Sequence, residues 1–297
     1  MRFLRTEDFQ LKTSDQDSVL NMDVTHQGLT PEQIAELIDL VKKVHGFDFS
    51  DYTKASLKRR LTRIMQLKKL SFYDLKQALI NSPGFFQDFL EEITVNVTEM
   101  FRDPSFYKAL NSQVLPYLST YQHIKIWSAG CASGEEVYSL AILMRQAGLK
   151  DKSFIYGTDI NTVVLKEARK GIYSFRNIKS YTENYQIAGL NGSLTDHFTT
   201  MYDAATIHSE LKLNTLFSVH NLISDTGFNE FQLITCRNVF IYFETQLQER
   251  ILELFYNSLC PHGFLCLGSK ETIRSDLFKR KFVAVNQKEN IYQKIGS

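Results

Sequence analysis

The sequence predicts an α/β fold: an all-α N-terminal domain, then a doubly wound parallel sheet with a small inserted β-subdomain and an antiparallel C-terminal edge. Three observations predict it. Helical spacing of apolar residues dominates the first third of the chain. From about residue 124, short apolar runs alternate with amphipathic segments, as in parallel strands joined by crossover helices. The last two apolar runs have little helix between them, so an antiparallel edge is expected.

The N-terminal third divides into a tail and a helical domain. Residues 1–28 are polar and lack periodicity, so we expect a flexible tail. A helix is predicted to begin at Thr30, where the run TPEQ offers an N-cap, a proline at the first helical position and Gln33 to close a capping box. A second helix is expected from about Asp51 to Leu70, a third from Ser71 with Asp74, and a further one at FFQDFLEEIT. Residues 29–95 are therefore predicted to form a small helical domain.

The rest of the chain, residues 96–297, is predicted to form one domain around the sheet. Its parallel strands are expected at four apolar runs that end in polar or glycine turns: KIWSAG (125–130), SFIYGTD (153–159), TLFSVHN (215–221) and FQLITCRN (231–238). A turn is expected at CPHG, before the closing strands. The second and third runs lie unusually far apart, since 57 positions separate Asp159 from Leu216. Residues 173–213 are therefore expected to form an inserted subdomain.

Composition limits the class of protein. A formal net charge of +1 argues against a surface built wholly for nucleic acid. The four cysteines form no C-x-x-C pair and the histidines are scattered, so neither a disulfide framework nor a metal site is expected. No apolar run is long enough to span a membrane and the N-terminus lacks a signal peptide, so we expect a cytoplasmic protein without membrane insertion.

The first predicted strand leads into a small-residue loop, GCASGEE, that suggests a ligand site. Ligands bind doubly wound sheets at the carboxyl ends of the strands, and Gly130 and Gly134 would allow close approach of a ligand to the backbone. Asp159 follows Gly134 by 25 positions, a spacing that suits an acid binding ribose hydroxyls, although it could equally cap the next helix. The loop lacks G-K-[ST], and its glutamates would repel a pyrophosphate. A cationic adenosine ligand such as S-adenosylmethionine is therefore favoured.

Six motifs in series resemble one family. They are ITVNVTEMFRDPSF (93–106), WSAGCASGEEVYSLA (127–141), GTDIN (157–161), ARKGIY (168–173), HNLI (220–223) and CRNVFIYF (236–243). In order and spacing the chain resembles the CheR family, S-adenosylmethionine-dependent methyltransferases that esterify glutamate side chains of bacterial chemotaxis receptors. The likeness covers nearly everything after residue 30 and implies a Rossmann-like methyltransferase sheet, with S-adenosylhomocysteine as the product.

The resemblance also implies site residues. The implied cofactor contacts are Asn96, Thr98, Arg102, Glu135, Asp159, Asn221, Leu222, Arg237 and Asn238. Arg102 and Tyr242 correspond to positions beside the transferred methyl group, where Arg102 would orient a carboxylate and Tyr242 would shape the channel. A glutamate carboxylate is ionised at neutral pH, so no general base is required and alignment in a dry site should supply most of the catalysis.

The resemblance further implies a protein substrate. The second predicted helix is rich in Lys and Arg, with Arg59 and Arg63 opposite its apolar face. Such a run can be merely a solvated face, but in the family this helix faces the acidic helices of the receptor, which favours electrostatic docking. The insertion corresponds to a subdomain that in some members binds a receptor tether peptide. The matching segment 197–211 has no glycine, so tether binding is not expected.

Other functions stay open at this point. The chain could methylate nucleic acid or another protein, or bind the cofactor as a signalling scaffold. Nucleic-acid methylation is disfavoured because the position of the usual Pro-Pro-aromatic motif reads CRNVFIYF, and Cys236 lacks the preceding proline of a cytosine-methylase nucleophile. We expect a monomer that binds no nucleic acid.

Overall fold

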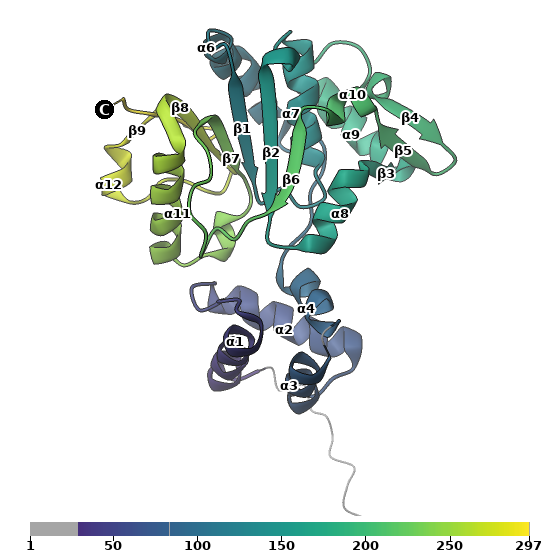
Figure 1. Cartoon of the computed structure of the whole chain (residues 1–297), viewed down its shortest axis with the longest axis vertical. Helices are drawn as coiled ribbons and strands as arrows, with labels where there is room; N and C mark the ends of the chain where they lie inside the picture. The colour runs from purple at the N-terminus through teal and green to yellow at the C-terminus, as the bar shows by residue number, and fades with distance from the viewer. Residues whose placement is uncertain (1–28, 83, 297) are drawn as a thin grey trace, which may run out of the picture.

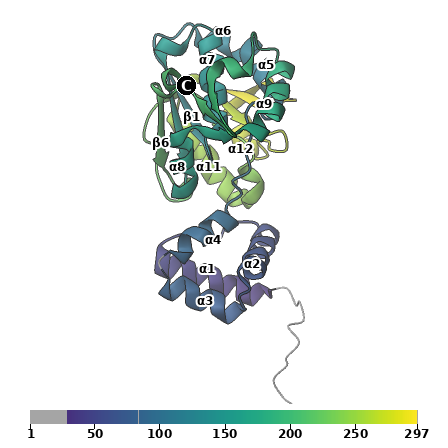
Figure 2. The same ribbon diagram turned by 90° about the vertical axis from the view of Figure 1, so that its right-hand side faces the viewer.

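The computed structural model describes residues 29–82 and 84–296, which form a helical part and a larger α/β part (Figure 1). The predicted tail, residues 1–28, lies outside the described residues. Figure 2 shows the four N-terminal helices grouped beneath the α/β part, with α4 nearest to it. Within the described residues no helix is both long and apolar enough to cross a bilayer.

Four helices build the N-terminal part: α1 (Pro31–His45), α2 (Lys54–Lys68), α3 (Phe72–Asn81) and α4 (Phe85–Ile93). The capping box at Thr30 is present, because its side chain accepts from the backbone N–H of Gln33 while the Gln33 side chain accepts from Thr30. Ser71 and Asp74 cap α3 in the same way. These signals begin the helices at the residues that the sequence predicts.

A seven-stranded sheet forms the centre of the α/β part, in the order β6-β2-β1-β7-β8-β10-β9. Its strands are β1 (Ile124–Ala129), β2 (Ser153–Asp159), β6 (Thr215–Val219), β7 (Phe231–Cys236), β8 (Leu259–Leu267), β9 (Phe282–Asn286) and β10 (Ile291–Lys294). The first five strands of this order run parallel, and the last two pairings are antiparallel. The predicted fold class, including the antiparallel edge, is confirmed.

Helices cover both faces of the sheet, as a doubly wound fold requires. Alternate residues of β1 belong to different cores: Ile126 packs in the cluster that contains α7, while Trp127 packs in the cluster that contains α11. The rings of Trp127 and Phe255 of α11 meet edge-on with centroids 5.3 Å apart. The helices around the sheet are α5 (Pro104–Ala109), α6 (Leu115–Leu118), α7 (Glu135–Gln146), α8 (Thr162–Lys170), α11 (Thr245–Ser258) and α12 (Asp276–Lys279).

The insertion between β2 and β6 has a sheet of its own. Its strands β3 (Ile172–Ser174), β4 (Phe198–Met201) and β5 (Ala204–Ile207) pair antiparallel in the order β3-β5-β4, with α9 (Phe175–Ile187) and α10 (Ser209–Lys212) beside them (Figure 1). The turn predicted at CPHG falls within the bounds of β8, but the pairing with β7 is interrupted there. Leu259 pairs with Phe231 and Phe264 with Leu233, and His262 between them has φ of 62°. A local irregularity in the pairing with β7 absorbs the residues that read as a turn.

Candidate active site

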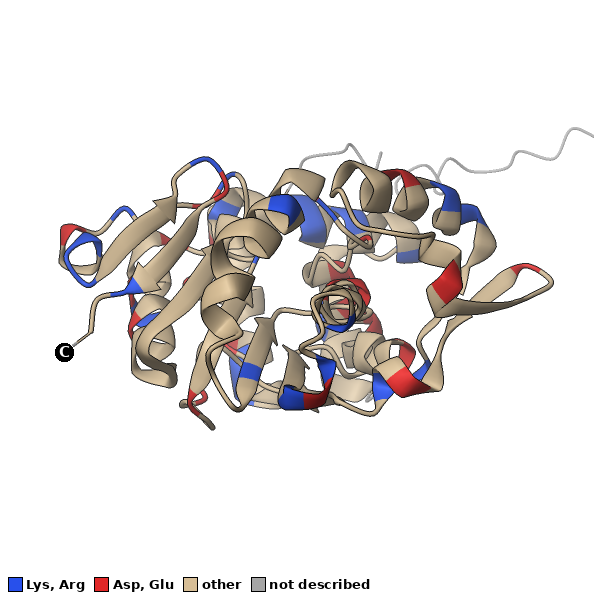
Figure 3. Ribbon diagram, turned by 90° about the horizontal axis from the view of Figure 1, so that it is seen from above, with Lys and Arg blue, Asp and Glu red and all other residues tan. Residues whose placement is uncertain are grey.

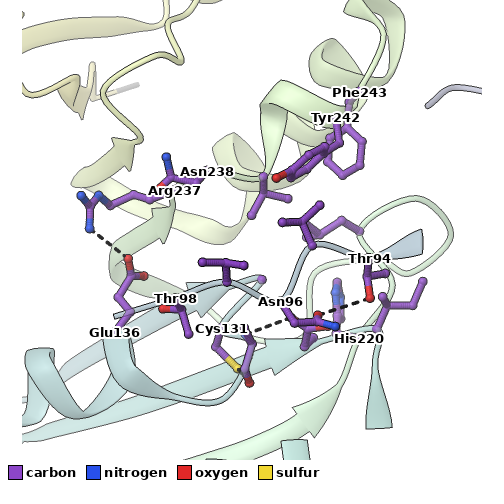
Figure 4. A pocket seen from close by; sticks show the side chains of 18 of the residues that line it. Thr94, Asn96, Thr98, Cys131, Glu136, His220, Arg237, Asn238, Tyr242 and Phe243 are labelled. Atoms are coloured by element: carbon purple, nitrogen blue, oxygen red, sulfur yellow. Dashed lines mark hydrogen bonds and ion pairs between the residues drawn. The ribbon is translucent and has the colours of Figure 1, made fainter. Parts of the chain in front are cut away.

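The polar clusters at the strand ends meet around one pocket. It lies at the carboxyl ends of β1 and β7, where the strand order reverses, and holds about 990 Å³ of empty space up to its open mouth. Segment 93–99 and Tyr52 of the helical part complete its wall (Figure 4). Nine of the residues implied by the family resemblance line it: Asn96, Thr98, Arg102, Asp159, Asn221, Leu222, Arg237, Asn238 and Tyr242. Glu135, Arg59 and Arg63 are not among the lining residues.

Two glycines in the loop after β1 are required by packing. Gly130 has φ of 80°, and a Cβ there would lie 2.6 Å from Cγ2 of Val239 in the loop after β7. Gly134 has φ of 90°, and a Cβ there would lie 2.9 Å from Cβ of Ala168 in α8. Of the two, only Gly130 lines the pocket. The close approach that these glycines permit is therefore made by other parts of the chain.

Asp159, at the end of β2, is a half-buried carboxylate held by backbone donors. Its Oδ2 accepts from the N–H of Ala132 at 3.0 Å and its Oδ1 from the N–H of Asn161 at 2.9 Å. Burial raises the pKa of this carboxyl, and the backbone donors oppose that rise. Asp159 thus supports the turn before α8, and as a pocket residue it can also accept hydrogen bonds from a ligand.

The two glutamates of the loop face different surroundings. The Glu135 carboxylate accepts from Ser133 Oγ at 2.7 Å and from the Tyr181 hydroxyl of α9 at 3.4 Å, and burial raises its pKa. Glu136 lines the pocket instead: its Oε1 accepts from Ser128 Oγ at 2.8 Å and from Thr235 Oγ1 at 2.6 Å. Successive residues of a helix point about 100° apart, so only one of two adjacent glutamates can face the pocket. In this loop it is Glu136.

The Arg237 guanidinium makes its contacts with other groups of the protein. Its side chain is 2% exposed, and its guanidinium pairs with Glu136 at 3.2 Å and with Asp103 at 2.8 Å (Figure 4 shows the first pair). The same group donates to the backbone oxygen of Arg102 at 2.9 Å and lies 4.0 Å from the centroid of the Phe106 ring. Arg237 therefore joins the Glu136 loop to the Arg102 turn, and its contribution to a ligand is to keep these two walls in place.

Arg102 lies on a strained turn. Phe101 and Asp103, on either side of it, have φ of 53° and 55°, a region that non-glycine residues seldom adopt. Three contacts hold the turn: the N–H of Phe101 donates to Ser139 Oγ at 2.9 Å, Asn184 donates to the oxygen of Met100, and Arg237 binds Asp103. Among the residues that the structure describes, the Arg102 guanidinium donates only to the oxygen of Val97, at 3.1 Å, so donors remain for a ligand.

The helical part reaches the pocket through the segment before α2. The N–H of Thr53 donates to the oxygen of Tyr242 at 2.9 Å, and the N–H of Glu244 donates to the oxygen of Asp51 at 2.8 Å. Burial raises the pKa of the half-buried Tyr242 hydroxyl, and the nearby positive charges of Arg60, Arg102 and Arg59 oppose the rise. Tyr242 thus lies close to three arginines from two parts of the chain.

Three residues in or near the pocket were not predicted as site residues from the sequence: Glu136, Tyr52 and Arg60. Glu136 could not be distinguished from the adjacent Glu135 in the sequence. Arg60 is one of many cations in α2, but it alone has a buried Nε without a hydrogen-bond partner among the α2 cations that the structure describes. Tyr52 gives no signal in the sequence, because only the tertiary fold brings the segment before α2 beside Tyr242 and Phe243.

The pocket fits an adenosine ligand with a cationic end. Asp159 can accept from ribose hydroxyls, and Ile160, Leu222 and Ile223 supply apolar walls for a base. Glu136, Glu99 and Arg102 can bind the charged amino-acid end of S-adenosylmethionine. Among the described residues no cluster of His, Cys, Asp and Glu could hold a metal ion.

Comparisons with known proteins identify the family of the chain. Residues 96–290 match the family model described as CheR methyltransferase, SAM binding domain, and residues 32–94 match its all-alpha domain. A Pseudomonas putida protein that carries the name Cher3 is 40% identical over 91% of this chain and 100% of its own. The chemotaxis protein methyltransferase of Borreliella burgdorferi is 31% identical, covering 88% of this chain and 95% of its own. That of Listeria monocytogenes is 32% identical, covering 79% and 87%. The chain belongs to the CheR family of methyltransferases, whose cofactor is S-adenosylmethionine.

Proposed function

We propose that this protein transfers the methyl group of S-adenosylmethionine to glutamate side-chain carboxylates in the cytoplasmic helices of chemoreceptors. The products are glutamate methyl esters and S-adenosylhomocysteine. The names of the Borreliella and Listeria relatives support a role in chemotaxis. The observation that carries the choice of acceptor is the gathering of cations at Tyr242. Arg102 lines the same pocket, and α2, which carries Arg59 and Arg60, begins directly after Thr53, whose N–H donates to the oxygen of Tyr242. Such a site favours an anionic acceptor.

Different pocket residues are assigned to different parts of the cofactor. Asp159 would hold the ribose and Glu136 the ammonium group of the amino-acid end, with Asn96, Thr98, Asn221, Leu222 and Asn238 as further contacts. When bound, S-adenosylmethionine supplies an electrophilic methyl group on a sulfonium. Arg237 keeps Glu136 and the Arg102 turn at a fixed separation. We assign Arg102 to orient the acceptor carboxylate through its guanidinium fork, and Tyr242 to shape the channel and donate one hydrogen bond.

Nothing in this reaction calls for a general base. The acceptor carboxylate is ionised at neutral pH, and its oxygen attacks the methyl group directly. The chain must therefore align the oxygen with the methyl group and exclude water. Burial of Tyr52 and Phe243, at 9% and 6% exposure, supports a dry wall on the side of the pocket that faces the helical part.

The helical domain, residues 29–95, is proposed to recognise the substrate through α2. Among the described residues Arg59 and Arg60 make no ion pair, whereas Arg63 pairs with Glu92 of α4 at 3.0 Å. We therefore assign the larger share of docking to Arg59 and Arg60, and a smaller share to Arg63. In the view from above, Lys and Arg are interspersed with Asp and Glu over the molecule, which suits a local docking site better than a nucleic-acid surface (Figure 3). A monomer in the cytoplasm suffices for this function.

The inserted subdomain is not proposed to bind a receptor tether peptide. Its strands β4 and β5 are joined by Tyr202 and Asp203 alone, without a glycine-bearing loop. Direct recognition of the methylated helices is therefore favoured. A receptor tail peptide that bound with micromolar affinity would overturn this part of the proposal.

The proposal is tested by incubating the protein with S-adenosylmethionine labelled in the methyl group, together with a receptor cytoplasmic fragment or with RNA. We expect label in the receptor fragment, released as methanol by mild base, and none in RNA. Label in RNA, or base-stable label in protein, would replace the proposed acceptor with another. A fragment whose methylatable glutamates are changed to alanine is the matched control.

A further inference from the structure

Glu271 is a buried carboxylate that does not line the pocket but supports a loop that forms one of its walls. It is 4% exposed and follows β8 in the chain. Its Oε2 accepts from the N–H of Asn238 at 2.8 Å and from the N–H of Gly268 at 2.6 Å. Its Oε1 accepts from the N–H of Ile241 at 3.3 Å. One side chain thus binds two points, Asn238 and Ile241, of the loop that follows β7.

This loop carries two residues of the candidate site. Asn238 has φ of 62°, and the chain then makes a single 3₁₀ turn, η4 (Phe240–Tyr242), that ends at Tyr242. The first N–H groups of a helical turn have no partner within the turn, so they need an acceptor from elsewhere. Glu271 accepts from one of them, the N–H of Ile241, which lies 30 residues away in sequence. A carboxylate at the start of a helical turn is also favoured by the turn's dipole.

A glycine shows how tightly this contact is built. A Cβ added to Gly268 would lie 2.5 Å from Oε2 of Glu271 and 2.8 Å from the nitrogen of Asn238. The side chain of Asn290 donates to the oxygen of Gly268 at 2.9 Å and holds the other side. The glycine leaves room for the carboxylate, and the carboxylate determines where Asn238 lies.

The acceptor here has to be an anion with two accepting oxygens. Among the described residues Glu271 forms no ion pair, and its hydrogen-bond donors are backbone N–H groups. An amide in its place would present one NH₂ group toward an N–H donor, whichever way it turned. A glutamine of the same shape is therefore not equivalent to the glutamate.

We propose that Glu271 is a positioning residue for the active site, one that holds Asn238 and Tyr242 in the geometry required for cofactor binding and methyl transfer. The proposal rests on the role of these two residues in the proposed function. Glu271 acts through the loop and touches neither cofactor nor substrate.

The test compares Glu271→Gln and Gly268→Ala with the wild-type protein. The first removes one accepting oxygen, and the second crowds the same contact while leaving Glu271 in place. The dissociation constant for S-adenosylhomocysteine is measured by calorimetry well below each melting temperature, followed by the kcat and KM of methyl transfer. Both variants are expected to raise the dissociation constant by about tenfold, the effect of one lost hydrogen bond to a charged group, and to lower kcat.

Two control variants separate positioning from general stability. At Gly84, with φ of −71°, an added Cβ meets nothing within 4 Å, so Gly84→Ala should behave as wild type. Leu75 is fully buried in α3, away from the pocket, so Leu75→Ala should lower the melting temperature without changing the dissociation constant.

The outcomes are distinct. Unchanged binding and unchanged kcat in Glu271→Gln would overturn the positioning role, as would an equal loss of affinity in Leu75→Ala. Wild-type protein that failed to bind S-adenosylhomocysteine would instead overturn the site described above. Normal binding by all proteins, with kcat lost only in Glu271→Gln and Gly268→Ala, would support the positioning of Tyr242.

Discussion

Tyr52 of the helical part and Phe243 of the α/β part pair across an antiparallel β-bridge, and their rings meet edge-on with centroids 5.1 Å apart. Both residues line the cofactor pocket. The bridge lies between the start of α2, which carries the arginines proposed for docking, and Tyr242 at the pocket. The domain proposed to recognise the substrate therefore also forms a wall of the cofactor site.

Tyr52→Ala should weaken binding of S-adenosylhomocysteine by about tenfold, because it removes a buried ring from the pocket wall and its edge contact with Phe243. Tyr52→Phe keeps the ring and should bind nearly as the wild type does. Isothermal titration of the two variants measures the difference. Equal affinities for the alanine variant and the wild type would show that the helical domain does not contribute to the cofactor site.

Glu136→Gln should lower both the stability and the cofactor affinity more than Glu135→Gln does. It removes a charge that faces Arg237, whose side chain is 2% exposed, and leaves Asp103 as the remaining counterion. We expect a decrease of about 2–3 kcal/mol in the free energy of unfolding and loss of cofactor binding. Glu135 accepts hydrogen bonds from neutral hydroxyls, so its variant should keep the affinity within about threefold. Urea denaturation and calorimetry test the pair; the reverse order would assign the cofactor contact to Glu135.

Affinity for S-adenosylhomocysteine should fall at acidic pH, as Asp159 takes up a proton. Burial raises the pKa of its carboxyl above 3.8, so the loss begins at a higher pH than for an exposed aspartate. For folding the sign is opposite: a raised pKa stabilises the folded protein below pH 3.8, and this contribution is lost as the pH rises through the folded-state value. Calorimetry across pH should show the decline in wild type and a weak, flat profile in Asp159→Asn. A wild-type affinity constant down to pH 3.8 would contradict the assignment.

Arg60→Ala should reduce transfer to a receptor fragment by about tenfold through KM, with a decreased dependence on salt, while cofactor affinity stays unchanged. Arg63→Ala is the matched control in the same helix. Its ion pair with Glu92 already occupies the guanidinium, so a smaller loss is expected. Initial rates at several salt concentrations distinguish the two variants. Equal losses of transfer rate would show that docking is shared evenly along the helix and does not depend mainly on Arg60.

Much of the architecture could be predicted from the sequence because its signals are local. The capping boxes at Thr30 and Ser71 mark two helix starts, and the four apolar runs became the parallel strands at their expected positions. The turn signal at CPHG coincides with the irregularity in β8, where the pairing with β7 passes from Leu259 to Phe264.

The site could be predicted less completely from the sequence, because its geometry depends on contacts between segments that are distant in the chain. Nine of the residues implied by the family resemblance line the pocket, but the resemblance did not distinguish Glu135 from Glu136. Nor did it reveal that the Arg237 guanidinium faces Asp103 and Glu136. Glu271 gives no motif signal at all. Its role follows from a loop that returns 33 residues later to meet Asn238.

The central claim is that the acceptor is a glutamate carboxylate of a chemoreceptor. Tandem mass spectrometry of a receptor cytoplasmic fragment, incubated with the protein and S-adenosylmethionine, tests it most directly. We predict methyl groups on glutamate side chains as base-labile esters, absent when Arg102→Ala replaces the wild type under conditions where the cofactor stays bound. Methyl groups on lysine or on chain termini, an unmodified fragment, or near-normal turnover by Arg102→Ala would contradict the account.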